Sequence, residues 1–179
     1  PLDMALSPDG IKMAVSYMRV NGNKISTHIA FYNFGSAGQM ELNNQVGELN
    51  VDDVLAPQIF FCDNSTAVAV RTDGFTVFSG SQSPKEKKTV KFDQEIISTF
   101  HDGNRIGFVF DGGDSGHKYL MKVYNTGGKN TMQKYFDLQY NSITLQKDKI
   151  VLFNEKEFAI YKLNGQKTFQ GKYRKPIQN

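Results

Sequence analysis

The feature that most constrains the fold is a fourfold repeat of short, strand-like runs. Each copy joins a run of small and β-branched residues to a second run that ends in an aromatic residue, and a Gly-bearing turn follows. The closing aromatics are Tyr32, Phe78, Tyr124 and Tyr161, so the spacings between repeats are 46, 46 and 37 residues. Repeats of about 40–50 residues built from short strands predict the blades of a β-propeller.

The repeats divide the chain into four blade-like units at about residues 2–54, 55–93, 94–137 and 138–175. We expect each unit to form one antiparallel sheet with an apolar inner strand and a polar outer strand. A single sheet of this composition cannot bury both faces, so neighbouring sheets must stack. The sequence therefore predicts an all-β fold in which residues 1–179 form a single β-propeller domain or a fragment of one.

The number of blades in the complete ring is open at the level of sequence. Four blades could close a small ring, and rings of six to eight blades are an equally fair interpretation. We take the four units to be part of a larger ring. The first and last sheets of such a fragment would be exposed, and two chains could pair as a homodimer through these open propeller edges.

Turn residues place the strand ends within each unit. In the first unit, the polar stretch 35–53 is expected to hold an outer strand around residues 40–42. Residues 49–55 give the strongest helix signal in the chain, although it is a weak one. In the second unit, residues 79–88 are expected to form a loop rich in Ser and Lys, followed by an outer strand over 89–92.

Composition excludes several classes of protein. The net charge of +3, from 21 basic and 18 acidic residues, does not indicate a nucleic-acid partner. The single cysteine, Cys62, excludes an internal disulfide and a multi-cysteine metal site, and its apolar surroundings predict a buried, inert thiol. No apolar run approaches ~20 residues, so we expect no membrane insertion by this segment, which reads as soluble and globular. Because the chain opens at Pro1 without Met, we expect it to come from a longer protein.

One turn carries a resemblance to known propellers. The sequence Ser7-Pro8-Asp9-Gly10 is similar to the S-P-D-G turn of WD-repeat and TolB-type propellers. The motif is strict in the first unit only, and residues 62–69 keep a looser form of it.

The whole chain also resembles the C-terminal part of an uncharacterised family of membrane-anchored, propeller-like proteins from Gram-positive bacteria. Residues 14–17, 29–35, 66–69 and 106–111 carry this resemblance. It implies an N-terminal membrane anchor outside this segment and an extracytoplasmic propeller. The family has no known activity, so the resemblance assigns no functional residue.

The tetrapeptide Gly113-Asp114-Ser115-Gly116 matches the sequence around the nucleophile of chymotrypsin-like serine proteases. That chemistry needs a His to activate the Ser and a buried Asp to orient the His. The chain has three histidines, His28, His101 and His117, and none lies in a protease-like context. The repeat places the tetrapeptide at a hairpin tip, where Asp and Gly serve the backbone turn. We therefore favour a turn over a protease site.

The remaining candidate sites also favour structural interpretations. Asp102, Asp111 and Asp114 lack the closing Glu and regular spacing of a calcium loop. His28 lies in the middle of a strand, where a hydrogen-bonded or surface side chain is favoured over a metal ligand, and His101 and His117 are expected to be solvated at turns. Two basic clusters, 85–88 and 172–175, are interpreted as a solvated loop and a polar terminus.

The sequence identifies no catalytic, cofactor-binding or metal-binding residue. We expect a non-enzymatic binding or scaffold module that recognises a protein or a glycan through propeller loops. The loops we favour are 21–24, 73–74, 111–118 and 154–157, because they occupy the same place in each repeat and should share one edge. Two alternatives remain: an enzyme whose active site is completed by the missing part of the chain or by a second subunit, and a purely structural half-ring.

Overall fold

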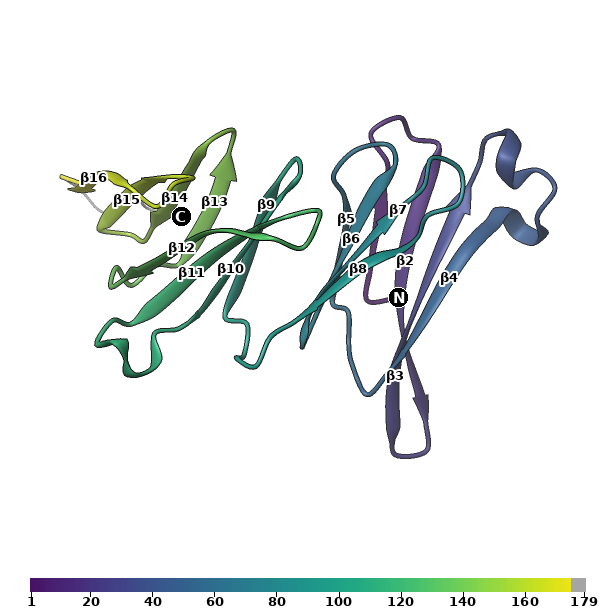
Figure 1. The fold of residues 1–179 in the computed structure, drawn as a ribbon, viewed down its shortest axis with the longest axis horizontal. Helices are drawn as coiled ribbons and strands as arrows, with labels where there is room; N and C mark the ends of the chain where they lie inside the picture. Colours follow the sequence, from purple (N-terminus) through teal and green to yellow (C-terminus); the bar gives the residue numbers. More distant parts are fainter. Residues whose placement is uncertain (175–179) are drawn as a thin grey trace. The chain divides into compact units, whose positions relative to one another are not determined.

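The computed structural model describes residues 1–174 and consists of four sheets, each with four antiparallel strands that pair in chain order (Figure 1). The first two sheets comprise β1 (Asp3–Leu6), β2 (Lys12–Asn21), β3 (Lys24–Asn33) and β4 (Gln45–Asp52), then β5 (Gln58–Phe61), β6 (Thr66–Arg71), β7 (Gly74–Ser79) and β8 (Lys85–Lys91). The last two comprise β9 (Ser98–Asp102), β10 (Arg105–Asp111), β11 (Tyr119–Asn125) and β12 (Asn130–Phe136), then β13 (Ser142–Gln146), β14 (Lys149–Phe153), β15 (Glu157–Lys162) and β16 (Lys167–Lys172). Three short 3-10 turns, η1 (Ser36–Gly38), η2 (Leu42–Asn44) and η3 (Gly113–Ser115), lie in the connections.

The chain forms two compact units, residues 1–93 and 94–179. The first unit holds the first and second sheets, and the second unit holds the third and fourth. The predicted all-β fold with four antiparallel sheets is confirmed.

The core of the first unit lies between its two sheets. Ile29 and Phe31 of β3 contact Ile59 of β5 and Phe78 of β7, and the rings of Phe31 and Phe78 are 4.8 Å apart between centroids. Small residues such as Ala67 on β6 allow the two sheets to approach closely. Stacking therefore buries the alternate side chains of each strand that point toward the neighbouring sheet.

The second unit repeats this arrangement. Met121 and Val123 of β11 share an apolar cluster with Ile150 and Leu152 of β14 and Tyr161 of β15. All five side chains are buried. Each unit thus has its own hydrophobic core between two blades.

The repeated aromatic residue marks a β-bulge in every sheet. The register between the third and fourth strands shifts immediately before Tyr32, Phe78, Tyr124 and Tyr161. The outer strand carries the extra residue, which increases the local twist of the sheet. The repeated aromatic in the sequence therefore corresponds to a β-bulge that is repeated in every sheet.

Each aromatic also has a fixed direction. Phe78 packs on the sheet that precedes its own in the chain, and so does Tyr161. The residue immediately before the aromatic points the opposite way: Phe31 and Val123 pack on the sheet that follows. Every blade consequently has a preceding face, which is directed toward the sheet before it in the chain, and a following face, which is directed toward the sheet after it. The aromatic at the bulge lies on the preceding face, and the residue before it lies on the following face.

The S-P-D-G segment forms the tight turn that its sequence predicts. The Ser7 hydroxyl donates to Asp9 Oδ1 at 2.5 Å, and Gly10 has a φ of +70°, which favours glycine. The Asp9 N–H donates to the side-chain oxygen of Asn64 at 3.0 Å. The turn thereby links β1–β2 of the first sheet to the β5–β6 turn of the second.

The outer strands of the first two sheets differ from the sequence-based expectations. Residues 40–42 form turns instead of a strand, because the chain reverses at Asn43 and Asn44, both with positive φ. Residues 49–55 are not helical, since β4 extends to Asp52. Residues 85–88 belong to β8, where their polarity reflects exposure on an outer strand.

One prediction for the third sheet also differs from the structure. His101 lies within the strand β9 instead of at a turn.

Among residues 1–174, the structure has no helix that is long and apolar enough to cross a membrane.

Candidate functional site

The hairpins between the second and third strands meet the linker between the two blades of each unit. In the first unit, the Asp53 N–H donates to the Ile25 carbonyl at 2.9 Å, and the Thr72 N–H donates to the Leu55 carbonyl at 2.8 Å. The β2–β3 and β6–β7 hairpins therefore lie at one edge of this unit. These are the loops 21–24 and 73–74 that the repeat predicts to share an edge.

The second unit has the same arrangement. The Lys118 N–H donates to Asp137 Oδ1 at 2.9 Å, and the Asn141 N–H donates to the Phe153 carbonyl at 2.9 Å. Asn154 also holds the linker, because its side-chain amide donates to the Gln139 carbonyl. The loops 111–118 and 154–157 thus share an edge within their own unit. That all four loops share one edge stays a prediction.

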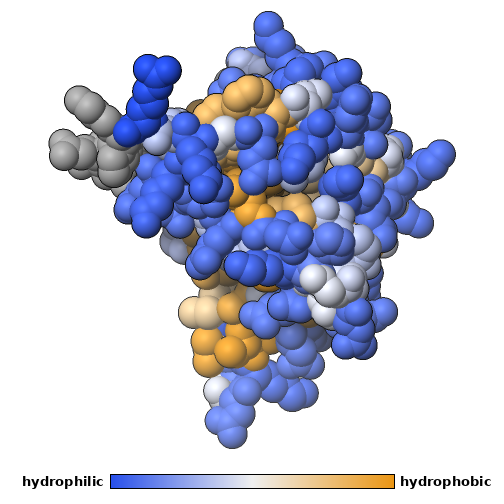
Figure 2. All heavy atoms as spheres, turned by 90° about the vertical axis from the view of Figure 1, so that its left-hand side faces the viewer, coloured by the Kyte–Doolittle hydropathy of each residue, from blue (hydrophilic) through white to orange (hydrophobic). Residues whose placement is uncertain are grey.

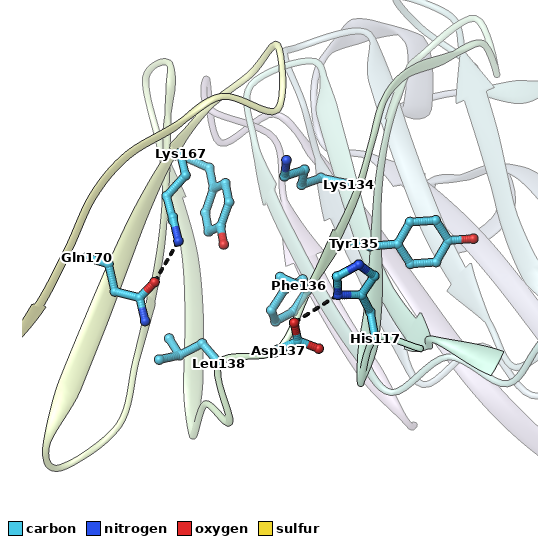
Figure 3. A pocket seen from close by; sticks show the side chains of 9 residues that line it. His117, Lys134, Tyr135, Phe136, Asp137, Leu138, Lys167 and Gln170 are labelled. Atoms are coloured by element: carbon cyan, nitrogen blue, oxygen red, sulfur yellow. Dashed lines mark hydrogen bonds and ion pairs between the residues drawn. The ribbon is translucent and has the colours of Figure 1, made fainter. Parts of the chain in front are cut away.

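A groove of about 250 Å³ opens beside this linker, between β12 and the last two strands of the second unit (Figure 3). Its floor is apolar, because Phe136, Leu138 and Tyr161 are all buried. Lys134 stands on one side, and Lys167 stands on the other with its ammonium 2.8 Å from Gln170 Oε1. The groove combines apolar contact area with two cationic groups at its rim.

One end of the groove is closed by an acid–base pair. His117 Nδ1 lies 2.8 Å from Asp137 Oδ2, and the His117 ring stacks on Tyr135 with 5.7 Å between centroids. The hydrogen bond from His117 and the backbone N–H of Lys118 hold the pKa of the Asp137 carboxyl below its usual value. Asp137 therefore stays ionised at neutral pH and fixes the β10–β11 hairpin to the linker.

The Tyr161 hydroxyl at the floor of the groove is a weak acid. Burial raises the pKa of the Tyr161 phenol, and the nearby Asp137 carboxylate raises it further. Tyr161 therefore remains a neutral hydroxyl at physiological pH. Its role in the groove is that of an apolar surface with one hydrogen-bonding group.

The protease-like tetrapeptide forms the tip of the β10–β11 hairpin, as the repeat predicts. Ser115 Oγ accepts the backbone N–H of His117 at 3.2 Å, while the His117 ring turns to Asp137 and Tyr135. The side chains of His117 and Asp137 are 47% and 59% exposed. A serine-protease triad needs its imidazole on the serine hydroxyl and a buried carboxylate, so this geometry does not support proteolysis.

The other candidates have structural partners. His28 is buried, with Nδ1 2.8 Å from Asn50 Oδ1 and Nε2 3.7 Å from Glu48, which agrees with a hydrogen-bonded side chain. Burial, followed by the charge of Asp63, raises the pKa of the half-buried Cys62 thiol to about 12, so it is unreactive at neutral pH. Within residues 1–174, no group of three or more His, Cys, Asp or Glu residues could hold a metal ion.

Of the two basic clusters, 85–88 lies on the exposed outer strand β8. The second begins at Lys172, the last residue of β16, and its final member, Lys175, lies outside the described residues. Among the described residues of the two clusters, none lines the groove. Sequence reasoning missed the groove itself, because its two lysines come from outer strands of different blades.

Solved structures share the fold of this chain. Sqt1 from Chaetomium thermophilum matches with a TM-score of 0.64 and 12% identity over 90% of this chain and 42% of its own. Sqt1 from Saccharomyces cerevisiae gives a TM-score of 0.60 and 12% identity over 93% and 46%, and HIRA residues 644–1017 give 0.53 and 10% over 87% and 50%. These are β-propeller proteins, so the predicted fold class is confirmed. The chain spans about half the length of the propellers it matches.

Comparisons of sequence place the chain in a family. No curated protein sequence gives a significant match. A family model described as a family of unknown function, DUF5711, matches residues 1–179, which is the whole length of the sequence. The expectation of an uncharacterised propeller-like family is confirmed at this level, and the chain belongs to the DUF5711 family.

Proposed function

We propose that this chain is a non-enzymatic binding module that holds a segment of a partner protein in the groove of the second unit. The observation that carries the proposal is the buried apolar floor of Phe136, Leu138 and Tyr161 between the ammonium groups of Lys134 and Lys167. Concave sites with an apolar lining and a few convergent polar groups are the usual form of a binding pocket.

The chemistry of the groove favours a segment that is both acidic and apolar. An apolar or aromatic side chain would cover the floor, and a neighbouring carboxylate would pair with Lys134 or Lys167. The fixed loops at the same edge, 111–118 and 154–157, would contact the flanking residues of the segment. A second depression of about 320 Å³, lined by Gln139, Asn141 and 154–157, extends this polar surface.

The solved structure of BBS1N, whose fold matches with a TM-score of 0.53 and 8% identity, contains ARL6DN as a partner. The same architecture is therefore compatible with protein binding, which supports a protein ligand for this chain. The alternative of an enzyme completed by residues outside the chain or by a second subunit has no supporting observation among residues 1–174. A glycan ligand is the alternative that the experiment below distinguishes.

Selection from a random peptide display library against the purified 179-residue chain tests the proposal. We expect enriched peptides to combine Asp or Glu with an aromatic or aliphatic residue. Their affinity should fall by about tenfold or more in a Lys134→Glu, Lys167→Glu double variant, because both rim charges are reversed.

The matched control is Lys129→Glu with Lys147→Glu, which changes the net charge equally at two exposed turns. Equal losses in both double variants, or enriched peptides without acidic residues, would refute the groove as the site. If members of a glycan array bind in the groove and no peptide is enriched, the ligand is a glycan and not a protein.

We also propose, from the sequence resemblance, that the complete protein carries an N-terminal membrane anchor and presents this propeller outside the cytoplasm of a Gram-positive bacterium. Protease added to intact cells should then degrade the propeller region. Protection of that region until the cells are lysed would contradict the proposal.

A further inference from the structure

The connection between β3 and β4 carries two apolar side chains that are almost fully exposed. Met40 is 92% exposed and Leu42 is 85% exposed. They flank Glu41, which is also exposed, so three consecutive residues present a carboxylate between two apolar groups. Exposed apolar residues that are scattered singly are normal on a protein surface, whereas contiguous ones mark an interaction site.

The loop that carries these side chains, residues 36–44, is held in one conformation. The Glu41 N–H donates to the Gly38 carbonyl at 3.1 Å, and the Asn44 N–H donates to the Glu41 carbonyl at 3.1 Å. The side-chain amide of Asn44 also donates to the Gly38 carbonyl at 3.1 Å. Gly38 itself packs on β3, where an added Cβ would clash with the Asn33 carbonyl oxygen. A loop that is already ordered loses little conformational entropy when it binds.

The side chains around the loop are acidic. Residues 25–70 contain no Lys or Arg. Glu41 and Glu48 line a shallow depression of about 370 Å³ beside the loop. Gln45 Nε2 donates to Glu48 Oε2 at 3.1 Å, so this carboxylate is engaged within the first sheet.

Basic residues outside 25–70 neutralise this acidic surface only in part. Lys12 is buried, and its ammonium lies 4.0 Å from Asp9. The second sheet meets β4 where the Ser83 hydroxyl donates to the Val46 carbonyl, so Lys85, two residues further on, is an exposed base on this side. One exposed lysine against Glu41 and a second carboxylate leaves the loop acidic.

The groove of the second unit has the complementary chemistry. Its rim carries Lys134 and Lys167, and the hydrogen-bond partner of Lys167 is the neutral amide of Gln170. The acid at the groove, Asp137, is already bound by His117 and by a backbone N–H. Figure 2 shows the molecule from the side of β16, where the surface is mostly hydrophilic with smaller apolar areas. A ligand for this side therefore needs polar groups as well as apolar ones.

We propose that the segment bound in the groove is residues 39–42 of a second copy of this chain. This inference rests on the proposed function, because it names the partner of the same groove. Met40 or Leu42 covers the apolar floor, and the Glu41 carboxylate pairs with Lys134 or Lys167. The loop thus supplies the acidic and apolar combination that the groove favours, at the highest apolar exposure found among residues 1–174.

A second acidic and apolar segment, residues 93–97, fits the groove less well. Its apolar residue Ile97 is 49% exposed, and the Ile97 N–H donates to the Val109 carbonyl at 2.8 Å. Backbone pairing therefore holds the end of this segment against its own sheet. Glu95 in the same segment is exposed and offers a matched control for the charge of Glu41.

The contact joins unlike surfaces, since a loop of one copy enters a groove of the other. Each copy therefore keeps one free loop or one free groove after the first contact forms. Contacts of this kind extend into chains or close into rings. The average mass in solution should consequently rise with protein concentration.

Light scattering on the 179-residue chain tests the proposal. We expect the average mass to rise above that of one chain as the concentration increases. Glu41→Lys, and separately Lys134→Glu with Lys167→Glu, should raise the dissociation constant of self-association by about tenfold or more. Met40→Ser with Leu42→Ser should weaken it by about tenfold or more through lost apolar contact. Glu95→Lys is the control and should leave it unchanged. Circular dichroism verifies that each variant retains its strands.

Mixing the charge-reversal variants identifies the two surfaces that meet. The loop of the Glu41→Lys copy and the groove of the Lys134→Glu, Lys167→Glu copy are again opposite in charge, and so are the unaltered groove and loop. An equimolar mixture should therefore regain the association that each variant loses alone. A mixture that stays monomeric would overturn the contact between loop and groove.

The remaining outcomes separate this inference from the proposed function. If the wild-type chain is monomeric at every concentration while selected peptides still bind the groove, the second copy is overturned as the ligand and the binding module stands. If association is lost in Glu41→Lys but kept in the groove variant, the loop binds another surface and the inference is overturned. A monomeric chain whose groove also selects no peptide would overturn both.

Discussion

Substitution of Thr27, whose hydroxyl is buried, measures how much this side chain stabilises the linker between the first two blades. Thr27 is 1% exposed, and its hydroxyl both donates to the Val54 carbonyl at 2.7 Å and accepts the Ala56 N–H at 3.1 Å. Thr27→Val keeps the shape of the side chain but removes both hydrogen bonds. The Ala56 N–H would then be buried without a partner.

The size of the effect follows from these two groups. A buried amide that loses its hydrogen-bond partner costs about 1–3 kcal/mol, and the half-buried Val54 carbonyl, which water can reach, adds less. We expect a loss of about 2–3 kcal/mol in the free energy of unfolding. For a chain of this size, that loss lowers the melting temperature by about 4–12 °C.

Urea unfolding followed by circular dichroism measures the change. Thr72→Val is the matched control, because Thr72 is exposed and its hydroxyl accepts only a long, 3.4 Å bond from the Leu55 N–H in the same linker. We expect the control to lose at most about 0.5 kcal/mol. A Thr27→Val variant within about 0.5 kcal/mol of the control would refute the view that the linker is fixed by this side chain.

Three further predictions concern single residues. Gly107→Ala should lower the free energy of unfolding in urea by about 1–3 kcal/mol, because the added Cβ would clash with Cζ of the buried Phe100 ring. A second substitution, Phe100→Leu, should restore part of this stability. An unchanged free energy of unfolding in Gly107→Ala would contradict the packing. With a pKa of about 12, Cys62 should react with iodoacetamide at pH 8 at least ~50-fold more slowly than free cysteine, since the lost thiolate outweighs its higher nucleophilicity; a rate equal to that of free cysteine would contradict its burial. The hydrogen bond from His117 helps to lower the pKa of Asp137 in the folded protein. The stability gained from the ionised carboxylate is therefore present above the ordinary carboxyl pKa and is lost as pH falls through the lower folded pKa. Asp137→Asn should lower the free energy of unfolding more at pH 7 than at pH 2, and an equal loss at both pH values would exclude the ionised pair.

The sequence could predict the architecture because the fold repeats a strong local signal. Small apolar strands such as residues 67–70, followed by a run ending in an aromatic, recur in all four blades and are buried or partly buried in each. The hairpin tips were also predictable, since Asn, Asp and Gly favour tight turns. The outer strands of the first two blades were not, because β8 faces solvent along most of its length and lacks an apolar alternation.

The candidate site could not be predicted in the same way. His117 and Asp137 are 20 residues apart, and Lys134 and Lys167 come from outer strands of different blades. His117 lies beside Asp137 because β11 pairs with β12, which places Tyr119 opposite Phe136. Lys134 and Lys167 line one groove only because two sheets stack at a particular angle and spacing, which a repeat does not specify. The sequence signal near the groove is the hairpin tip 111–118, and the repeat predicts it from its position and not from its side chains.

The repeated aromatic connects the sequence pattern to the packing of neighbouring blades, and it yields a final prediction. Tyr161 is 4% exposed against the preceding sheet, so Tyr161→Ala should cost about 3–5 kcal/mol through lost burial and the resulting cavity. Tyr32 occupies the same repeat position but points away from its partner sheet, because Phe31 points toward it. Tyr32→Ala should therefore cost less than half as much. Equal costs for both variants would show that the aromatic acts through the bulge alone and not through its contact with the preceding sheet.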